Sequence, residues 1–184
     1  PGLALLADIS RALRRERALN GAVIITEPDV RPVVSDSGVS LIRVPHDATD
    51  RLIHEELTIL TNRLAGQWFA APDVPAIYRV ENGCWQLLVT PGEYDPVACH
   101  LQKRMMPRAG LRVGAAPHHG LGVPAYAPID CGLLRHADMV LQRQMAHRLA
   151  MGEILYTEED LVRILMASAA AREAARQIRL DTRG

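Results

Sequence analysis

The chain has 184 residues, and its 21 basic side chains balance its 21 acidic ones. A chain of this length buries enough surface to fold without a disulfide or metal staple, and its 48% hydrophobic content excludes an intrinsically disordered chain. The formal net charge of zero excludes bulk attraction to nucleic acid or to an anionic membrane. Any such binding must therefore come from local basic patches.

Residues 3–20 predict a helix, because apolar side chains recur there at helical spacing between arginines. Residues 21–45 then predict a small antiparallel meander with a turn at residues 36–38. Its three expected strands are the β-branched runs at residues 22–25, 31–34 and 39–44.

A long helix is predicted over residues 48–70 and a strand over residues 74–80. Residues 84–124 are rich in proline and glycine and are expected to be irregular. Two helices complete the chain, one over residues 133–151 and one that begins at a capping-box-like Thr157. This order of elements predicts a single α+β domain over residues 1–184.

No apolar run is long enough for a transmembrane helix, and no signal peptide is visible at the N-terminus. We therefore expect no membrane partner. The three cysteines are Cys84, Cys99 and Cys131. Their odd number and wide spacing predict reduced thiols in a cytoplasmic protein and not a disulfide framework.

Histidine and cysteine neighbours raise the question of a metal site. The candidates are Cys99 with His100, His118 with His119, and Cys131 with His136. None has the close-pair spacing of a structural zinc site, so no metal site is predicted. The Gly-Leu-Gly run at residues 120–122 lacks the third glycine of a dinucleotide-binding loop, and no Ser or Cys occupies a nucleophile elbow.

Two segments near the middle of the chain have a distinctive order. Residues 117–126 read Pro-His-His-Gly-Leu-Gly-Val-Pro-Ala-Tyr, and residues 130–138 read Asp-Cys-Gly-Leu-Leu-Arg-His-Ala-Asp. The first segment resembles the Pro-His-x-Gly-Leu-Gly-x-x-Ala-Tyr signature of the RNase II/RNase R family, the family of the RNB catalytic domain. Residues 50–62 resemble its Arg-Leu-Val-Glu-Glu helix, and residues 75–80 resemble its Pro-Ala-Leu-Tyr-Arg-Val strand. The resemblance extends from about residue 3 to residue 179.

The resemblance implies an α+β, RNB-like fold with a mixed or antiparallel sheet packed by long helices. It implies that the chain is the C-terminal part of such a catalytic domain, with no S1 or cold-shock domain. The activity it implies is stepwise removal of nucleotides from the 3′ end of single-stranded RNA. That hydrolysis uses Mg²⁺ held by four aspartates, an arginine on the phosphate and aromatic side chains that stack on bases.

Two departures from the family pattern bear on activity. The family's aspartates lie upstream of the matched region, and no aspartates here form its spaced quartet, so no Mg²⁺ ligand is identified. In the family, residues 130–138 would read Thr-Ser-Pro-Ile/Leu-Arg-Arg/Lys-Tyr-x-Asp. The first arginine position is Leu134, whereas Arg135 and Asp138 are retained. Adjacent helical residues point about 100° apart, so Arg135 is not expected to replace the first arginine.

The resemblance makes Arg135 the catalytic candidate. The RNA-binding candidates that it implies are His118, His119, Tyr126, Arg135, Glu55, Lys103 and Arg104. Each has a structural alternative. His118 either lines the RNA channel or caps the Gly-Leu-Gly turn, and Tyr126 either stacks on a base or packs in the core. Glu55 either faces the terminal nucleotide or lies on a solvated face.

A short basic stretch contains Lys103, Arg104, Arg108 and Arg112 without an intervening acid. It either follows a nucleic-acid backbone or is a solvated loop. The arginine bias of the whole chain also has two interpretations: it fits either phosphate recognition or a GC-rich genome.

Three functions therefore compete. The first is part of a 3′-to-5′ exoribonuclease domain that binds single-stranded RNA and receives its aspartates from a missing segment or a partner chain. The second is a catalytically dead RNB-like domain that binds RNA or protein, which the altered segment at residues 130–138 favours. The third is a small-molecule enzyme that uses the turn at His118 and His119.

Overall fold

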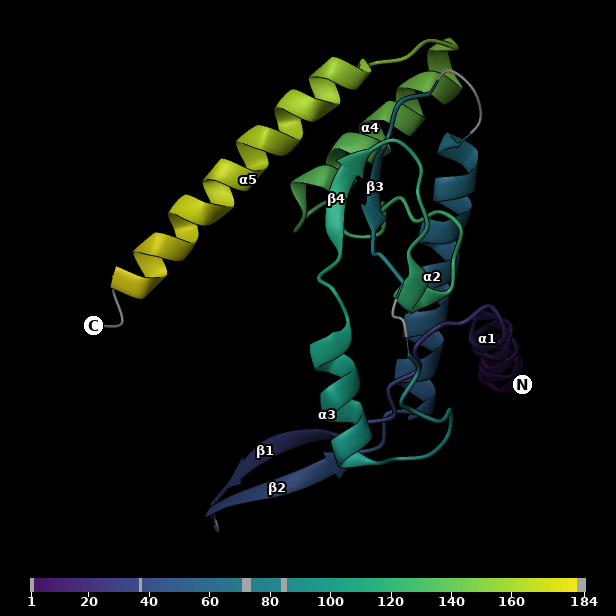
Figure 1. The fold of residues 1–184 in the computed structure, drawn as a ribbon, viewed down its shortest axis with the longest axis vertical. Coiled ribbons are helices and arrows are strands. Elements are labelled where there is room, and N and C mark those ends of the chain that lie inside the picture. Colours follow the sequence, from purple (N-terminus) through teal and green to yellow (C-terminus); the bar gives the residue numbers. More distant parts are fainter. Residues whose placement is uncertain (1, 37, 71–73, 84–85, 182–184) are drawn as a thin grey trace. The chain divides into compact units, whose positions relative to one another are not determined.

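A computed structural model describes residues 2–36, 38–70, 74–83 and 86–181. Its helices and strands confirm the α+β class, with two small antiparallel sheets (Figure 1). The elements are α1 (Gly2–Leu19), β1 (Asp29–Ser35), β2 (Gly38–Val44), α2 (Thr49–Phe69), β3 (Ile77–Val80), α3 (Pro96–Met105), β4 (Gly110–Val113), the 3₁₀ turn η1 (His119–Leu121), α4 (His136–Met151) and α5 (Glu158–Asp181).

The chain forms two compact units that alternate along the sequence. Unit 1 contains Pro1–Leu60, Glu81–Arg108 and His118–Val123. Unit 2 contains Thr61–Val80, Ala109–Pro117 and Pro124–Gly184. The continuous helix α2 belongs to unit 1 up to Leu60 and to unit 2 from Thr61. That residues 1–184 behave as a single domain stays a prediction.

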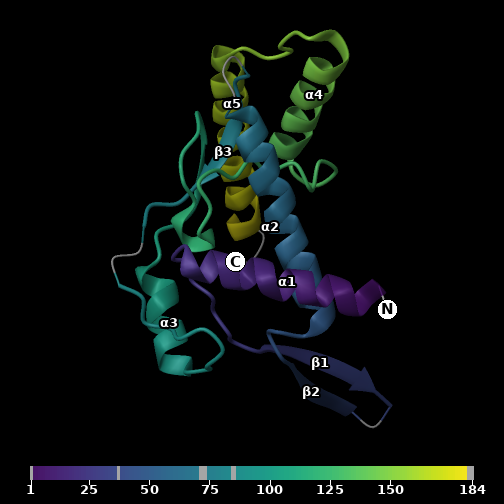
Figure 2. The same ribbon diagram turned by 90° about the vertical axis from the view of Figure 1, so that its right-hand side faces the viewer.

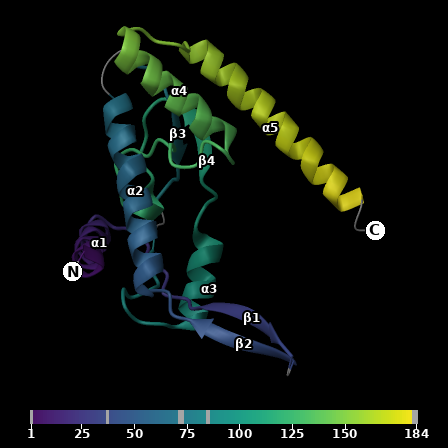
Figure 3. The same ribbon diagram turned by 180° about the vertical axis from the view of Figure 1, so that it is seen from behind.

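The β1–β2 hairpin of unit 1 has the predicted turn, with Asp29 opposite Val44 and Ser35 opposite Gly38. Figure 3 shows its two strands side by side. The third predicted strand, at residues 22–25, is wrong, since these residues pair with neither strand. The Val23 amide instead donates to the Gly120 carbonyl at 3.0 Å. Pairing with the 3₁₀ turn thus replaces pairing within the sheet.

The irregular segment predicted over residues 84–124 contains a helix, α3, and a strand, β4. Helix α3 begins at an Asp-Pro pair. The Asp95 carboxylate accepts from the amides of Val97 at 2.8 Å and Ala98 at 3.1 Å, and Pro96 occupies the first turn, where no amide donor is needed. This N-cap stabilises a helix in a segment whose proline and glycine content had predicted an irregular structure.

Unit 2 holds the main hydrophobic core. Strands β3 and β4 pair antiparallel, with Ile77 opposite Val113 and Val80 opposite Gly110 (Figure 1). The predicted strand at residues 74–80 is therefore shorter, covering Ile77–Val80. The buried cluster consists of Ala65, Phe69, Val74, Ala76, Ile77, Tyr78, Ala125, Ala127, Val140, Leu141 and Leu161.

The two C-terminal helices follow the prediction closely. Helix α4 begins at His136 and not at residue 133, because Arg135 is its extended N-cap residue. At the start of α5, the Asp160 amide donates to Thr157 Oγ1 at 3.2 Å and the Asp160 carboxylate accepts from the Thr157 amide at 3.0 Å. These reciprocal bonds form the predicted capping box.

The remaining sequence expectations concern cysteines and the membrane. Cys99 and Cys131 are free thiols, and Cys84 lies outside the described residues. Among the described helices, none has the length and hydropathy needed to cross a bilayer.

Candidate RNA-binding site

A polar cluster in unit 2 is centred on Asn62, a fully buried residue of α2. Its side-chain amide donates to Tyr126 Oη at 2.9 Å and to Asp130 Oδ1 at 2.7 Å, and its carbonyl oxygen accepts from the Ile129 amide at 2.8 Å. Asn62 thus joins the end of the Gly-Leu-Gly segment to the altered segment that follows it. A buried amide with all of these partners fixes their positions.

Arg135 extends this cluster through two carboxylates. Its Nη2 lies 2.7 Å from Asp130 Oδ1 and 2.9 Å from Asp138 Oδ2. Asp138 is buried and also accepts from the Cys131 amide at 3.1 Å. The Arg135 side chain nevertheless remains 39% exposed, so it is held in place and still reaches solvent.

Protonation in the cluster follows from burial and charge. Burial raises the pKa of Tyr126 above its ordinary value, so its hydroxyl stays protonated at neutral pH. Burial also raises the pKa of Asp138, against the opposing charge of Arg135. For Arg135, burial lowers the pKa, but Asp138 and Asp130 outweigh it and raise the pKa overall. Arg135 is therefore a permanent cation.

A cavity of about 1100 Å³ in unit 2 opens beside Arg135. We call it the Arg135 cavity. Its charged and titratable lining residues are Arg79 of β3, Arg135, His136 and Asp138 at the start of α4, and Arg172 of α5. Three arginines against one aspartate, itself paired with Arg135, give the cavity a positive excess that suits an anionic ligand.

Leu134 marks the main chemical change in this region. It stands where the resemblance expects the first arginine, it lines the Arg135 cavity, and it is 84% exposed. A leucine cannot donate a hydrogen bond to phosphate. The site therefore retains the second basic residue of the family pattern, Arg135, but lacks the arginine expected at position 134.

The Gly-Leu-Gly turn lies in unit 1 and is held by buried side chains. Gly122 has φ of +65°, and a Cβ there would lie 2.7 Å from the Arg17 carbonyl oxygen, so a larger residue cannot fit. Arg17 also donates to the Leu121 carbonyl at 3.0 Å. His118 is 5% exposed, with its Nδ1 3.5 Å from Glu81 Oε2. His118 is the N-cap residue of η1, but its side chain forms no capping hydrogen bond there, and His119 is exposed.

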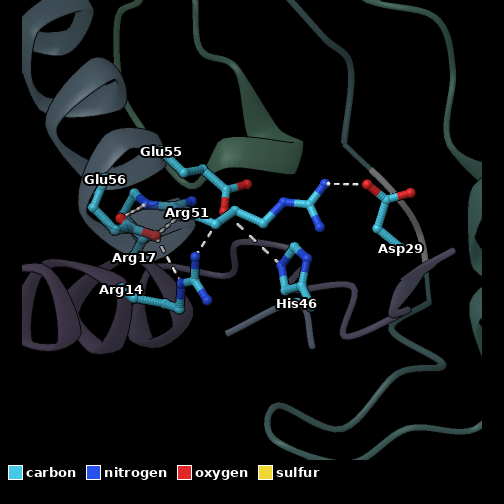
Figure 4. Close-up of polar contacts among 7 residues, drawn as sticks. All are labelled: Arg14, Arg17, Asp29, His46, Arg51, Glu55 and Glu56. Atoms are coloured by element: carbon cyan, nitrogen blue, oxygen red, sulfur yellow. Dashed lines mark hydrogen bonds and ion pairs between the residues drawn. The ribbon is translucent and has the colours of Figure 1, made fainter. Parts of the chain in front are cut away.

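Glu55 belongs to an arginine–glutamate network in unit 1 that joins α1 to α2 (Figure 4). Figure 2 shows the ribbons of these two helices crossing. Arg14 contacts Glu55 Oε2 at 2.7 Å and Glu56 Oε1 at 2.8 Å, and Arg17 contacts Glu56 Oε1 at 2.6 Å. Burial raises the pKa of Glu56, but the hydrogen bonds and charges of Arg17 and Arg14 outweigh it and lower the pKa overall. Glu55 is partly exposed at the rim of this network.

The basic stretch at residues 103–112 is not one continuous loop, since Lys103 and Arg104 lie in the last turn of α3 and Arg112 lies in β4. Lys103 forms an ion pair with Glu27, which offsets its charge, and Arg104 is exposed.

The structure thus links Tyr126 to Arg135 through two intermediates: Asn62 donates to both Tyr126 and Asp130, and Asp130 pairs with Arg135. Glu55, His118 and Lys103 each have separate partners within unit 1. Asn62 is the residue that the site prediction missed. The signal for it was its place at the end of the segment, residues 50–62, that resembles the family's Arg-Leu-Val-Glu-Glu helix.

The implied magnesium centre can be tested against the side chains present. Over the described ranges, no group of three or more His, Cys, Asp or Glu side chains could hold a metal ion. The described residues therefore do not fit an aspartate-bound Mg²⁺ centre.

Comparisons with known proteins agree with this picture. The family model "RNB domain" matches residues 2–151, and no curated protein sequence matches the chain. Among solved structures, an active-site mutant of the Dss1 exoribonuclease from Candida glabrata is similar with a TM-score of 0.69 and 19% identity, over 88% of this chain. Mycoplasma genitalium RNase R in complex with double-stranded RNA is similar with a TM-score of 0.69 and 14% identity, over 89% of this chain.

This chain spans only part of those proteins, 22% of the Dss1 chain and 35% of the RNase R chain. At these identities the structural likeness establishes the fold, while the family model covers most of the sequence. The chain belongs to the RNB domain family.

Proposed function

We propose that this chain is the RNA-contacting C-terminal part of a 3′-to-5′ exoribonuclease domain, and that a segment or partner chain outside it supplies the aspartates for hydrolysis. Its family and its exoribonuclease neighbours support this proposal. One neighbour, Mycoplasma genitalium RNase R, is described in complex with ribose-methylated single-stranded RNA, with a TM-score of 0.60 and 13% identity.

The observation that carries the proposal is the Arg135 cavity. Its arginines come from three different elements of unit 2 and converge on one space of about 1100 Å³. Guanidinium groups recognise phosphate oxygens through paired N–H donors. Asp130 and Asp138 hold Arg135 at the wall of this cavity, and the buried Asn62 fixes Asp130 in turn.

Binding of a labelled single-stranded oligoadenylate, followed by fluorescence anisotropy, tests the proposal. Arg172→Gln is the informative variant, because the side chain lines the cavity and, among the described residues, donates to the Ser168 carbonyl of its own helix. We expect weaker binding and a shallower salt dependence, by about 0.7 in the slope of log K against log salt for one lost contact.

Arg176→Gln is the matched control on the same helix, since Arg176 is exposed, pairs only weakly with Glu173 and does not line the cavity. Equal binding by wild type, Arg172→Gln and an Arg79→Gln/Arg172→Gln double variant would rule the RNA-contact proposal out.

A catalytically dead RNB domain is the second candidate, and Leu134 favours it. The position where the resemblance expects the phosphate-binding arginine carries an exposed aliphatic side chain. This candidate predicts that the purified chain releases no mononucleotides from RNA at any Mg²⁺ concentration. Magnesium-dependent release by the pure chain would contradict it.

A further inference from the structure

A second cavity lies entirely within unit 1, and the proposed RNA contact does not use it. Its volume is about 750 Å³, within the range of roughly 300–1,000 Å³ typical of small-molecule sites. Its walls come from α1, from the residues around the base of the hairpin and from the loop at residues 91–94. Four arginines line it: Arg11, Arg14, Arg15 and Arg43. We call it the Arg15 cavity.

The charges of these arginines are not equally available. Arg14 is neutralised by Glu55 and Glu56, and Arg11 pairs with Asp8. Within the part of the chain that the structure describes, neither Arg15 nor Arg43 has a carboxylate partner.

The remaining titratable lining residues do not neutralise the positive charge of Arg15 and Arg43. Burial lowers the pKa of His46, so its imidazole is neutral at pH 7. Asp47 is the one acidic side chain of the lining and is exposed. The Arg15 cavity therefore presents two unneutralised guanidinium groups to whatever enters it.

One of these groups is held by an aromatic ring. The Arg43 guanidinium carbon lies 5.2 Å from the centre of the Tyr94 ring, within the range of a cation–π contact. An arginine held in this way loses less conformational freedom when it forms paired hydrogen bonds to an oxyanion.

Apart from Thr26, the rest of the lining is apolar. Ile24 and Leu52 are buried side chains of the lining, and Ala18, Pro28, Pro45 and Pro91 add further apolar surface. An apolar floor next to unneutralised arginines suits a ligand with a flat hydrophobic part and a phosphate.

We propose that the Arg15 cavity binds a phosphate-bearing ligand of mononucleotide size, with the phosphate on Arg15 and Arg43 and the base on the apolar floor. Such a mononucleotide is the class of product that an exoribonuclease releases. The site does not require that this chain hydrolyse RNA, and it shares no residue with the Arg135 cavity.

Isothermal titration calorimetry of the full chain with adenosine monophosphate tests the proposal. We expect saturable binding that weakens by about tenfold or more, or 1.4 kcal/mol, in the Arg15→Gln/Arg43→Gln variant. Adenosine and inorganic phosphate, titrated separately, are each expected to bind more weakly than the nucleotide, because each fills only part of the site.

Arg143→Gln is the matched control. Arg143 also lies over an aromatic ring, 5.8 Å from the centre of Tyr156, but in unit 2 and outside the Arg15 cavity. This variant is expected to bind the nucleotide as wild type does. Equal binding by the wild type and the double variant would overturn the proposal, as would no binding by a wild type whose thermal unfolding is cooperative.

Competition identifies the source of the phosphate. If a single-stranded oligoadenylate displaces the nucleotide, the site takes phosphate carried by RNA; if it does not, the site takes free nucleotide. Both outcomes support a phosphate site at Arg15 and Arg43. The result is separable from that for the RNA contact, because Arg172→Gln alters only the Arg135 cavity.

Discussion

Arg17 and Glu56 form a buried, two-point ion pair between α1 and α2, with Nη2 2.6 Å from Oε1 and Nε 2.9 Å from Oε2 (Figure 4). Both side chains are almost inaccessible to solvent. Arg17 uses a further nitrogen to hold the Leu121 carbonyl. The same guanidinium therefore joins two helices and the Gly-Leu-Gly turn.

Breaking this pair is expected to be costly, because removing one partner leaves the other charge buried and unpaired. Glu56→Gln should destabilise the chain by about 3 kcal/mol or more, measured as the free energy of unfolding in urea. Asp8→Asn removes the carboxylate of an exposed pair with Arg11 on the same helix and should change that free energy by less than about 1 kcal/mol. Equal effects of the two variants would contradict the structural role of Glu56.

The same pair predicts how stability depends on pH. The folded-state pKa of Glu56 lies below its ordinary value of 4.5. Its contribution is therefore fully present above that value and is lost as the pH falls through the folded pKa. Urea midpoints measured from neutral pH downward should fall more steeply for wild type than for Glu56→Gln below about pH 4.5. Parallel curves would show that Glu56 is not responsible.

Close packing in unit 2 predicts a strong effect of one added methyl group. A Cβ on Gly66 of α2 would lie 2.8 Å from the Ala125 carbonyl carbon, which is backbone and cannot move aside. Gly66→Ala should cost about 1–3 kcal/mol, even though alanine favours a helix. Gly110→Ala is the control, because nothing lies within 4 Å of its Cβ position. A stabilised Gly66→Ala variant would contradict this packing.

Restoring an arginine at position 134 tests why the site departs from the family pattern. Leu134 is exposed, so Leu134→Arg should leave the free energy of unfolding nearly unchanged. It should tighten binding of single-stranded RNA and steepen its salt dependence by about 0.7. Leu149→Arg adds the same charge at an exposed position of α4 and should have a smaller effect. Equal gains from both variants would indicate non-specific attraction.

The elements that the sequence predicted are those with strong local signals. The capping box at Thr157 and the apolar faces of the long helices are such signals, and these helices lie where they were expected. The expected strand at residues 22–25 failed because its apolar residues pack for another reason. Ala22 and Ile24 pack in unit 1, and the Val23 amide is used by the carbonyl of Gly120, which is distant in sequence.

The candidate site likewise contains residues that the sequence predicted and one that it did not. Arg135 and Tyr126 came from the resemblance of short segments. Asn62, which links Tyr126 to the Asp130 partner of Arg135, lies 64 residues before Tyr126, and no periodicity within a helix predicts a bond across that separation. Helix α3, in contrast, had a local signal. Its Asp-Pro cap was present in the sequence, but the neighbouring prolines and glycines led to the prediction of an irregular segment.

The alternation of the two units along the chain has a consequence for how the protein is made. Unit 1 lacks its last piece until residue 123 has been synthesised, and the last piece of unit 2 begins only at residue 124. Domains generally fold as units during synthesis, so neither unit can be completed while most of the chain is still unmade. For the same reason, no single cut in the gene yields two fragments that each carry one whole unit and nothing of the other.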